Sequence, residues 1–387
     1  MRTLLRIIAT RLDALVAKGV SGHLDAKRIA GGFWDRIVSA HHPGWQGPSR
    51  SLHVRVCGSD HTIVEYGASS PWERILRWRD VETDLVLMCG AHKVTLIEAY
   101  DPYFASLMAL RVSRKAGVPW VVWVGSNDEL TYRRTGQLPY PQLRSIRLHR
   151  MLARYCLRRA HGVWGGNLNN RDAALALGAR PDRTDLVRDI GIDEIHFAPP
   201  PRDRRERGLC VVASRLSPEK RTGDAILAVK HASPMCPGLH LEVYGDGPER
   251  SDLEAMASRC GVKATFFGFV SAATLRSAYE RAAAVLIPLG GSSLVEAALA
   301  EALIIAYRDE WHAEFIHEVT LQNGYLVNPT PRSMADALAL VNAGLAYSSM
   351  GQTARRSAML MFSPEAVKRQ TAHAMDRARD VFLAERR

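Results

Sequence analysis

Short apolar runs alternate along the chain with longer segments whose apolar residues recur at helical spacing. In the first half, four runs have the length and composition of buried strands: 52–56, 84–88, 118–124 and 162–164. Two segments between them have the spacing of helices that cover a sheet: 102–115 and 142–159. Strands that alternate with helices are typical of βαβ units, so the pattern predicts a mostly parallel sheet.

The same rhythm returns in the second half. Five apolar runs predict strands at 209–213, 239–244, 264–267, 284–288 and 303–307. The segments between them predict helices at 223–231, 250–260, 273–282 and 294–301. This is the pattern of a doubly wound α/β sheet, in which ligands bind beyond the carboxyl ends of the strands.

Between the two halves lies a segment without an apolar period. Residues 197–208 contain three prolines and six charged residues, which predicts a linker. We therefore expect an N-terminal domain at 1–196 and a C-terminal domain at 209–370. A last helix at 371–387 could pack back on the N-terminal domain.

Composition narrows the class of protein. The 387 residues, 47% of them hydrophobic, are enough for about two or three domains with substantial cores. Six cysteines are scattered without metal-ligand spacing, so neither a disulfide framework nor a zinc site is predicted. Arg11 and Asp13 interrupt the start before a secretory core could form, and no apolar stretch approaches the ~20 residues that span a bilayer. These features predict a cytoplasmic protein.

The net charge of +11 is concentrated in the first half, since residues 1–200 hold 28 Lys and Arg against 19 Asp and Glu, a net +9. Such a bias fits an anionic membrane surface, nucleic acid, or solubility alone. No nucleic-acid-binding motif is present, so a nucleic-acid partner is not expected. Six apolar residues near the start have the spacing of a membrane-surface helix or of a first helix packed on the core: Leu4, Leu5, Ile8, Leu12, Leu15 and Val16.

Three loops that follow predicted strands carry chemical signals. The loop 214–220 places Arg215 and Lys220 on one turn, where they could clamp a diphosphate or simply be solvated surface cations. The loop 244–249 contains two glycines and a proline, which a plain turn also needs. The loop 288–297 is rich in glycine, and its serines could cap a helix whose exposed amides form an anion site.

Taken in this order, the loops resemble glycosyltransferase family 4, a retaining group with two facing Rossmann-like domains, the GT-B fold. The resemblance in the second half is carried by these segments: 214–220, 245–248, 267–271, 296–297 with 303–306, 323–327 and 362–365. The first half matches more loosely, through 98–102 and 178–181.

The resemblance implies roles for individual residues. Arg215 and Lys220 would bind the donor diphosphate and stabilise the charge that grows on it, and Glu296 would hold the ribose. Phe269 and Val270 would lie near the base. The other donor-binding candidates lie in the loop and helix start after residue 288: Gly290, Gly291, Ser292, Ser293 and Leu294. Because these cations supply the positive charge, we expect no metal requirement and no cofactor.

Several positions depart from the family pattern. Pro288 stands where the family has the first Glu of a Glu-x7-Glu pair, and the loop after it is shorter than usual. Glu301 and Leu303 replace a Gly and a Pro. Residues 125–128 offer no His such as many members carry, and the glycine-rich motif that commonly opens the first domain is not recognisable. These departures concern the donor sugar and the acceptor side.

Four polar residues of the first half are candidates for the acceptor side: Asp101, Asn127, Asp128 and His92. The first three follow predicted strands and could face a ligand, although residues of this kind also form turns.

Pattern and resemblance together predict a retaining glycosyltransferase of the hexosyltransferase type. It would move a sugar from a UDP- or GDP-linked donor to a glycan or glycolipid acceptor in surface polysaccharide assembly, and could be peripheral on the inner face of the membrane. A non-catalytic subunit that binds nucleotide sugars is the alternative, because of Pro288. A nicotinamide-dependent oxidoreductase is disfavoured, since no Gly-x-Gly-x-x-Gly opens either sheet. The sequence leaves base, sugar, acceptor, linkage and oligomeric state open.

Overall fold

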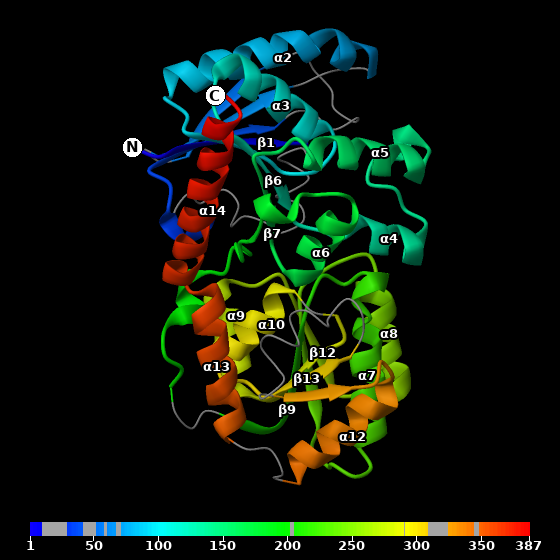
Figure 1. The fold of residues 1–387 in the computed structure, drawn as a ribbon. Helices are drawn as coiled ribbons and strands as arrows, with labels where there is room; N and C mark the ends of the chain where they lie inside the picture. The colour runs from blue at the N-terminus through cyan, green and yellow to red at the C-terminus, as the bar shows by residue number, and fades with distance from the viewer. Residues whose placement is uncertain are drawn as a thin grey trace. The chain divides into compact units, whose positions relative to one another are not determined.

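The computed structural model describes residues 1–9, 29–41, 52–57, 60–66, 71–201, 205–289, 291–308, 324–343 and 348–387. They form two compact units: unit 1, residues 1–191 with 364–387, and unit 2, residues 192–363 (Figure 1). Each unit has its own largely parallel sheet with interleaved helices. The predicted α/β class with two Rossmann-like domains is confirmed.

Unit 1 is built on an eight-stranded sheet of order β3-β4-β2-β1-β5-β6-β7-β8. Its strands are β1 (Thr3–Ile8), β2 (Arg36–His41), β3 (Leu52–Cys57), β4 (His61–Tyr66), β5 (Leu96–Ala99), β6 (Trp120–Val124), β7 (Gly162–Gly165) and β8 (Thr184–Leu186). Neighbouring strands are parallel except β3 and β4, which are antiparallel. Its α-helices are α2 (Pro71–Ala91), α3 (Phe104–Ala116), α4 (Asp128–Thr135), α5 (Ile146–Leu157), α6 (Leu168–Ala176) and α14 (Pro364–Ala384).

The first strand corrects the expectation of an amphipathic helix at the chain start. All six residues of β1 are buried, because β1 lies between β2 and β5. A strand covered on both faces reads as a continuous apolar run, which also fits helical spacing. Leu4 and Leu5 therefore face opposite cores. Three residues of the expected stripe, Leu12, Leu15 and Val16, lie outside the described residues.

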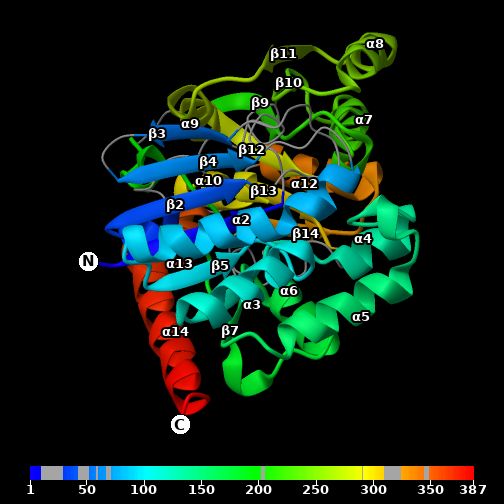
Figure 2. The ribbon, with the colours of Figure 1, turned by 90° about the horizontal axis from the view of Figure 1, so that it is seen from above.

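The apolar run at 84–88 is part of helix α2 and not a strand. Val81, Leu85 and Cys89 are buried four residues apart, whereas Leu87 is 65% exposed. One buried stripe is the burial pattern of a helix that covers a sheet. Figure 2 shows α2 together with α3 across one face of the unit 1 sheet.

Unit 2 is built on a six-stranded parallel sheet of order β11-β10-β9-β12-β13-β14. Its strands are β9 (Glu206–Ala213), β10 (His240–Tyr244), β11 (Ala264–Gly268), β12 (Ala282–Ile287), β13 (Ile304–Tyr307) and β14 (Gly324–Val327). Its α-helices are α7 (Thr222–Ala232), α8 (Arg250–Cys260), α9 (Ala272–Arg281), α10 (Ser292–Leu299), α12 (Pro331–Asn342) and α13 (Ser348–Phe362). In chain order the strands run 3-2-1-4-5-6, the order of a dinucleotide-binding fold.

The boundary between the units falls at Gly191 and Ile192, ahead of the predicted linker 197–208. The first part of that segment is held to helix α9. The buried guanidinium of Arg276 donates to the carbonyl oxygens of Ala198 at 2.8 Å and Pro199 at 3.0 Å. The last part belongs to strand β9. The residues predicted as a linker therefore belong to unit 2, and hydrogen bonds from Arg276 hold their first part to that unit.

The last helix, α14, belongs to unit 1 and begins at Pro364. Ala374 and Ala378 are buried against the sheet face opposite α2 and α3, in one core with Trp164. The amide of Arg188 donates to the side chain of Gln370 at 2.8 Å. Among the described helices, none combines the length and apolar composition that crossing a membrane requires.

Candidate functional site

The candidate site of unit 2 lies where the strand order reverses. Strands β9 and β12 are neighbours in the sheet, and from them the order continues to β10 and β11 on one side and to β13 and β14 on the other. Doubly wound sheets bind ligands outside the carboxyl ends of the strands at such a point. The loops concerned are 214–221 after β9 and 288–291 after β12.

The loop after β9 is fixed by backbone hydrogen bonds to the loop after β10. The amide of Ser214 donates to the carbonyl of Tyr244 at 3.0 Å, and that of Leu216 donates to Asp246 at 2.9 Å. The amide of Glu249 donates back to the carbonyl of Leu216 at 3.1 Å. The two loops are therefore joined by backbone hydrogen bonds at the carboxyl edge of the sheet.

Two glycines make this close approach possible. A Cβ on Gly245 would overlap the carbonyl oxygen of Ser214, and a Cβ on Gly247 would overlap that of Leu216. Gly245 also has φ of +112°, which L side chains rarely adopt. The Gly-Asp-Gly-Pro motif, which the sequence alone could not separate from a plain turn, supports the loop that carries Arg215.

Arg215 and Lys220 lie on this supported loop. The exposed guanidinium of Arg215 pairs with Glu219 and donates from Nε to the hydroxyl of Ser217 at 3.2 Å. Burial lowers the pKa of Lys220, the nearby charge of Arg215 lowers it further, and Glu219 partly opposes the change. No hydrogen bond or ion pair joins the Lys220 ammonium to another residue in the part of the chain that the structure describes. Within the described ranges it is a partly desolvated cation without a carboxylate partner.

A third cation, Arg221, is held by the fold. Its Nη2 atom lies 2.6 Å from Asp224 and 2.9 Å from the carbonyl oxygen of Pro329, and its guanidinium lies 4.8 Å from the ring centroid of Tyr307. These contacts satisfy its charge inside unit 2. The contrast with Lys220 singles out Lys220 as the cation available to a ligand.

Helix α10 begins beyond the loop after β12. Gly290 lies outside the described residues, and Gly291 is the residue before the helix, without a side-chain cap. The expectation that Ser292 or Ser293 caps this helix is therefore wrong, because both lie inside its first turn. Uncapped amides at a helix start favour an anion. Leu294 is fully buried and its amide donates to the carbonyl oxygen of Gly291 at 3.1 Å, and its contact with the sugar donor stays a prediction.

Glu296 lies one turn further along α10 and faces the interior in part. It accepts a hydrogen bond from the hydroxyl of Tyr279 at 3.4 Å and one from the side chain of Ser292. Burial raises the pKa of Glu296 to about 7, and the nearby Asp193 contributes in the same direction. Pro288, the residue in place of the family's first Glu, is buried after β12. The site thus holds one carboxyl that ionises near neutral pH.

The two candidates near the base lie farther along the same edge. Phe269 and Val270 follow β11, the edge strand of the sheet, and Phe269 is 63% exposed. Phe267, just before them, stacks on Tyr244 with centroids 4.8 Å apart. An exposed aromatic side chain at this edge offers a flat surface for a nucleobase.

In unit 1, Asp101 and Asp128 are brought into one buried aromatic cluster. Asp101 accepts from the hydroxyl of Tyr140 at 2.8 Å and from the amide of Tyr103 at 2.7 Å. Burial raises the pKa of Asp101 to about 6, and burial also raises that of Asp128. The side chain of Tyr103 is hydrogen-bonded to Asp128. The two tyrosines were not foreseen, since nothing in the local sequence marks them.

Asn127 and His92 have other positions. The side chain of Asn127 caps helix α4 by accepting from the amide of Leu130 at 3.0 Å, which is the turn-forming role. His92 lies between α2 and β5, at the amino end of the strand. It is therefore at the opposite edge of the sheet from Asp101 and Asp128.

The described residues contain no group of His, Cys, Asp and Glu suited to a metal ion.

The loops described in unit 2 lie in a segment whose sequence matches a known family. Residues 194–356 match the glycosyl transferases group 1. A 2-deoxystreptamine glucosyltransferase of Streptomyces kanamyceticus is 28% identical over 218 residues, which are 50% of this chain and 54% of that protein. The chain spans about half the length of this curated relative. Unit 2 is thus similar to glycosyl transferases of group 1, which supports the predicted class of transferase, while membership of family 4 stays a prediction.

Solved structures share the fold over the whole chain. HepE of Anabaena, solved with UDP, has a TM-score of 0.73 at 17% identity and covers 97% of this chain and 100% of its own. Sucrose-phosphate synthase of Thermosynechococcus elongatus has a TM-score of 0.71 at 15% identity and covers 99% and 100%. Both likenesses extend through unit 1, which the family match leaves out, and establish the fold there too.

Within the group 1 domain, the structure adds residues that the sequence did not single out. Gly245 and Gly247 support the cationic loop, Arg221 is bound internally, and Tyr279 contacts Glu296. The glycine pair after a strand was visible as a motif. The contact of Tyr279 with Glu296 joins residues 17 positions apart on two helices, so no local pattern reveals it.

Proposed function

We propose that this chain is a retaining glycosyltransferase that binds a nucleotide diphosphate sugar at the strand-order reversal of unit 2. The partly buried ammonium of Lys220 beside Arg215, which has no carboxylate partner among the described residues, is the observation that carries the proposal. A desolvated cation gains most from an anionic partner with several oxygen acceptors. A diphosphate provides such a partner, and the uncapped start of α10 favours the same charge.

The reaction would transfer the sugar to an acceptor hydroxyl. The bond between the anomeric carbon and the diphosphate oxygen breaks, its electron pair stays on that oxygen, and the acceptor oxygen bonds to the same carbon as its proton leaves. Negative charge therefore grows on the diphosphate. Arg215, Lys220 and the helix amides stabilise this charge in place before the reaction, which lowers the barrier without a metal ion.

Glu296 would hold the ribose in its ionised form. A carboxylate can accept hydrogen bonds from two neighbouring hydroxyl groups, and charge-assisted bonds of this kind are the strong ones. At position 288 the proline side chain offers no polar group, so the sugar would be held by backbone amides of the loop. We therefore expect free nucleotide diphosphate to bind nearly as tightly as the complete donor.

UDP-glucose is the first donor to test. The curated relative is a glucosyltransferase, and HepE was solved with UDP-glucose, with a TM-score of 0.69 at 16% identity and coverage of 97% of this chain and all of its own. For the acceptor we propose a glycan or glycolipid of surface polysaccharide assembly, bound by unit 1 near Asp101 and Asp128. The net charge of +9 in residues 1–200 supports a peripheral position on the inner face of an anionic membrane.

Release of UDP from UDP-glucose, with a bacterial lipid extract as acceptor, tests the proposal. Acceptor-dependent release that Lys220→Ala abolishes would support a transferase with this donor site. Binding of UDP-glucose without release for any donor or acceptor would favour the non-catalytic subunit instead. GDP-linked sugars, tested in parallel, separate the two nucleotide classes.

A further inference from the structure

Unit 1 contains a pocket at the edge of its sheet where strands β6 and β7 begin. The cavity measures about 340 Å3 and is lined by the ends of α3, α5 and α14, by the starts of the two strands, and by the turn after α6. Asp101 and Asp128 lie at the other end of these strands. At ~3.3 Å per residue, a strand of this length separates the two edges by roughly 16 Å. The pocket is therefore distinct from the acceptor-side cluster.

The lining of this pocket is strongly basic. Six arginines contribute to it: Arg114, Arg158, Arg159, Arg180, Arg183 and Arg386. Of the described residues that line the pocket, one is acidic, Glu385. The volume is at the lower end of the range of ligand pockets, about 300–1,000 Å3, and suits a small charged group.

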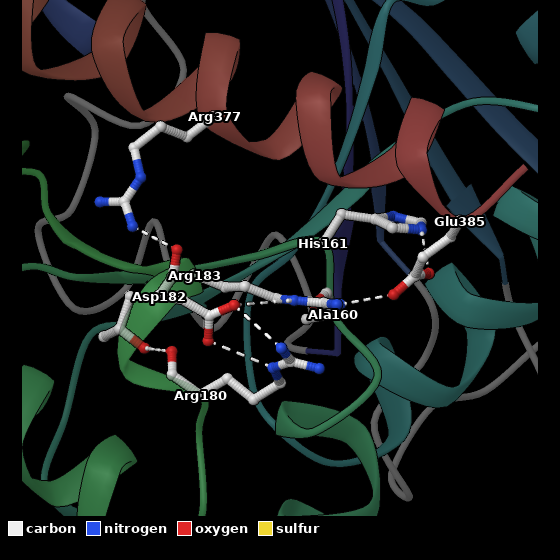
Figure 3. Close-up of polar contacts among 8 residues, drawn as sticks. Ala160, His161, Arg180, Asp182, Arg183, Arg377 and Glu385 are labelled. Atoms are coloured by element: carbon white, nitrogen blue, oxygen red, sulfur yellow. Dashed lines mark hydrogen bonds and ion pairs between the residues drawn. The ribbon is translucent and has the colours of Figure 1, made fainter. Parts of the chain in front are cut away.

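Internal ion pairs account for only part of this charge. Glu385 accepts from Arg183 at 2.7 Å and lies 3.5 Å from the imidazole of His161, and Arg180 pairs with Asp182 at 3.0 Å (Figure 3). Burial lowers the pKa of His161, which favours its neutral form. Glu385 and Asp182 therefore balance two of the six arginines.

The other four arginines have no carboxylate partner in the part of the chain that the structure describes. Arg159 lies over its neighbour Tyr155, with 3.9 Å from its guanidinium carbon to the ring centroid. Arg386 lies similarly over a ring, that of Phe382, at 5.2 Å. Arg114 and Arg158 are exposed residues at helix ends. Four like charges around one cavity repel one another unless an anion joins them.

The inner wall offers two further donors. Arg183 Nε and Trp120 Nε1 are buried and have no hydrogen-bond acceptor among the described residues. Arg183 is 9% exposed and Trp120 is fully buried, and both residues line the pocket. The Asp182 carboxylate is 3.9 Å from Arg183 Nε, beyond hydrogen-bond distance. Buried donors of this kind are costly unless a ligand or water completes them.

We propose that this pocket binds a phosphate group, as a second anion site separate from the donor diphosphate site of unit 2. Guanidinium forks match phosphate oxygens geometrically, and a doubly charged phosphate can engage several arginines at once. The phosphate could belong to a lipid headgroup or to a soluble compound. Both present the same oxygen atoms to the arginines, and the experiment separates them.

The first arm measures binding of inorganic pyrophosphate by calorimetry in a background with Arg215→Ala and Lys220→Ala, which removes the donor-site cations. We expect binding at one site, weakened at least tenfold by Arg114→Gln with Arg158→Gln. Arg79→Gln with Arg147→Gln is the matched control, since both are exposed helix residues of unit 1 outside the pocket. It removes the same charge and should change the affinity less than twofold.

The second arm measures co-sedimentation with phosphatidylcholine vesicles that contain or lack phosphatidic acid. A lipid ligand predicts binding that the pocket variant loses, that the control variant keeps, and that pyrophosphate competes away. A soluble ligand predicts pyrophosphate binding with equal sedimentation of all variants. Absence of saturable binding in both arms, or equal losses in pocket and control variants, would overturn the proposal. The melting temperature of each variant verifies that it is folded.

Discussion

Tyr279 and Glu296 are joined by a hydrogen bond of 3.4 Å from the tyrosine hydroxyl to Oε2, between helices α9 and α10. Tyr279 is fully buried, so the bond draws the glutamate carboxyl toward the interior of unit 2. Burial is also the main reason that the pKa of Glu296 is raised to about 7. The charge of Glu296, which we propose binds the ribose, therefore changes near neutral pH.

We expect the affinity for UDP to increase as the pH rises through about 7. Below this pKa the carboxyl is protonated, and a neutral carboxyl accepts hydrogen bonds from ribose hydroxyls less strongly than a carboxylate. Above this pKa the Glu296 carboxyl is already ionised before UDP binds. One linked proton allows a slope of at most about tenfold per pH unit. Calorimetric titration of UDP across this range measures the slope.

Two variants separate Glu296 from the nucleotide's own ionisation. Glu296→Gln should bind UDP about ten- to a hundredfold more weakly and keep only the pH dependence of the nucleotide phosphates. Tyr279→Phe should move the midpoint to higher pH, because its hydroxyl stabilises the charged form. If Glu296→Gln binds UDP as well as the wild type does, Glu296 is only a helix residue.

Replacement of Lys220 or Arg215 by alanine should lower turnover by about a hundredfold or more, because each removes a preorganised positive charge from the departing diphosphate. Steady-state release of UDP is the measurement. Lys230→Ala is the matched control: Lys230 is an exposed lysine of the neighbouring helix α7 and should leave turnover unchanged. Near-normal activity of Lys220→Ala would refute the diphosphate assignment.

Gly247→Ala should destabilise unit 2 by about 1–3 kcal/mol, because the added methyl group overlaps the carbonyl oxygen of Leu216. It should also weaken UDP binding, since the displaced loop carries Arg215. Gly90→Ala is a suitable control, because this helical glycine has open space around it and alanine there should stabilise by about 0.5–1 kcal/mol. Denaturant unfolding of both variants compares them, and equal effects would exclude the proposed support of the loop.

Transfer should continue in EDTA, because Arg215, Lys220 and the start of α10 supply the positive charge that a divalent ion provides in other transferases. The chain also contains no Asp-x-Asp motif. Initial rates with EDTA, magnesium and manganese make the comparison. A complete loss of transfer that manganese or magnesium restores would contradict this account.

The sequence by itself determined the architecture of unit 2 and the positions of its loops. The helix predicted at 250–260 is α8 (Arg250–Cys260), and each predicted strand from 209 to 307 overlaps an observed strand. Buried parallel strands are apolar on both faces, whereas the helices that cover them are apolar on one face. The local sequence patterns of these strands and helices therefore differ. Where that difference is weak the prediction fails, as at β1 and at 84–88. The motif order also located Arg215, Lys220 and Glu296 after the correct strands.

Only the tertiary structure decided what those residues experience. Gly247 is required because Leu216 passes against it, and the pKa of Glu296 is raised by burial among groups from other segments. The arginine pocket gathers Arg158 and Arg386, more than two hundred residues apart in the chain. Desolvation, steric overlap and unbalanced charge depend on which segments the topology brings together. Local sequence constrains each segment's own conformation, but these three effects arise only between segments.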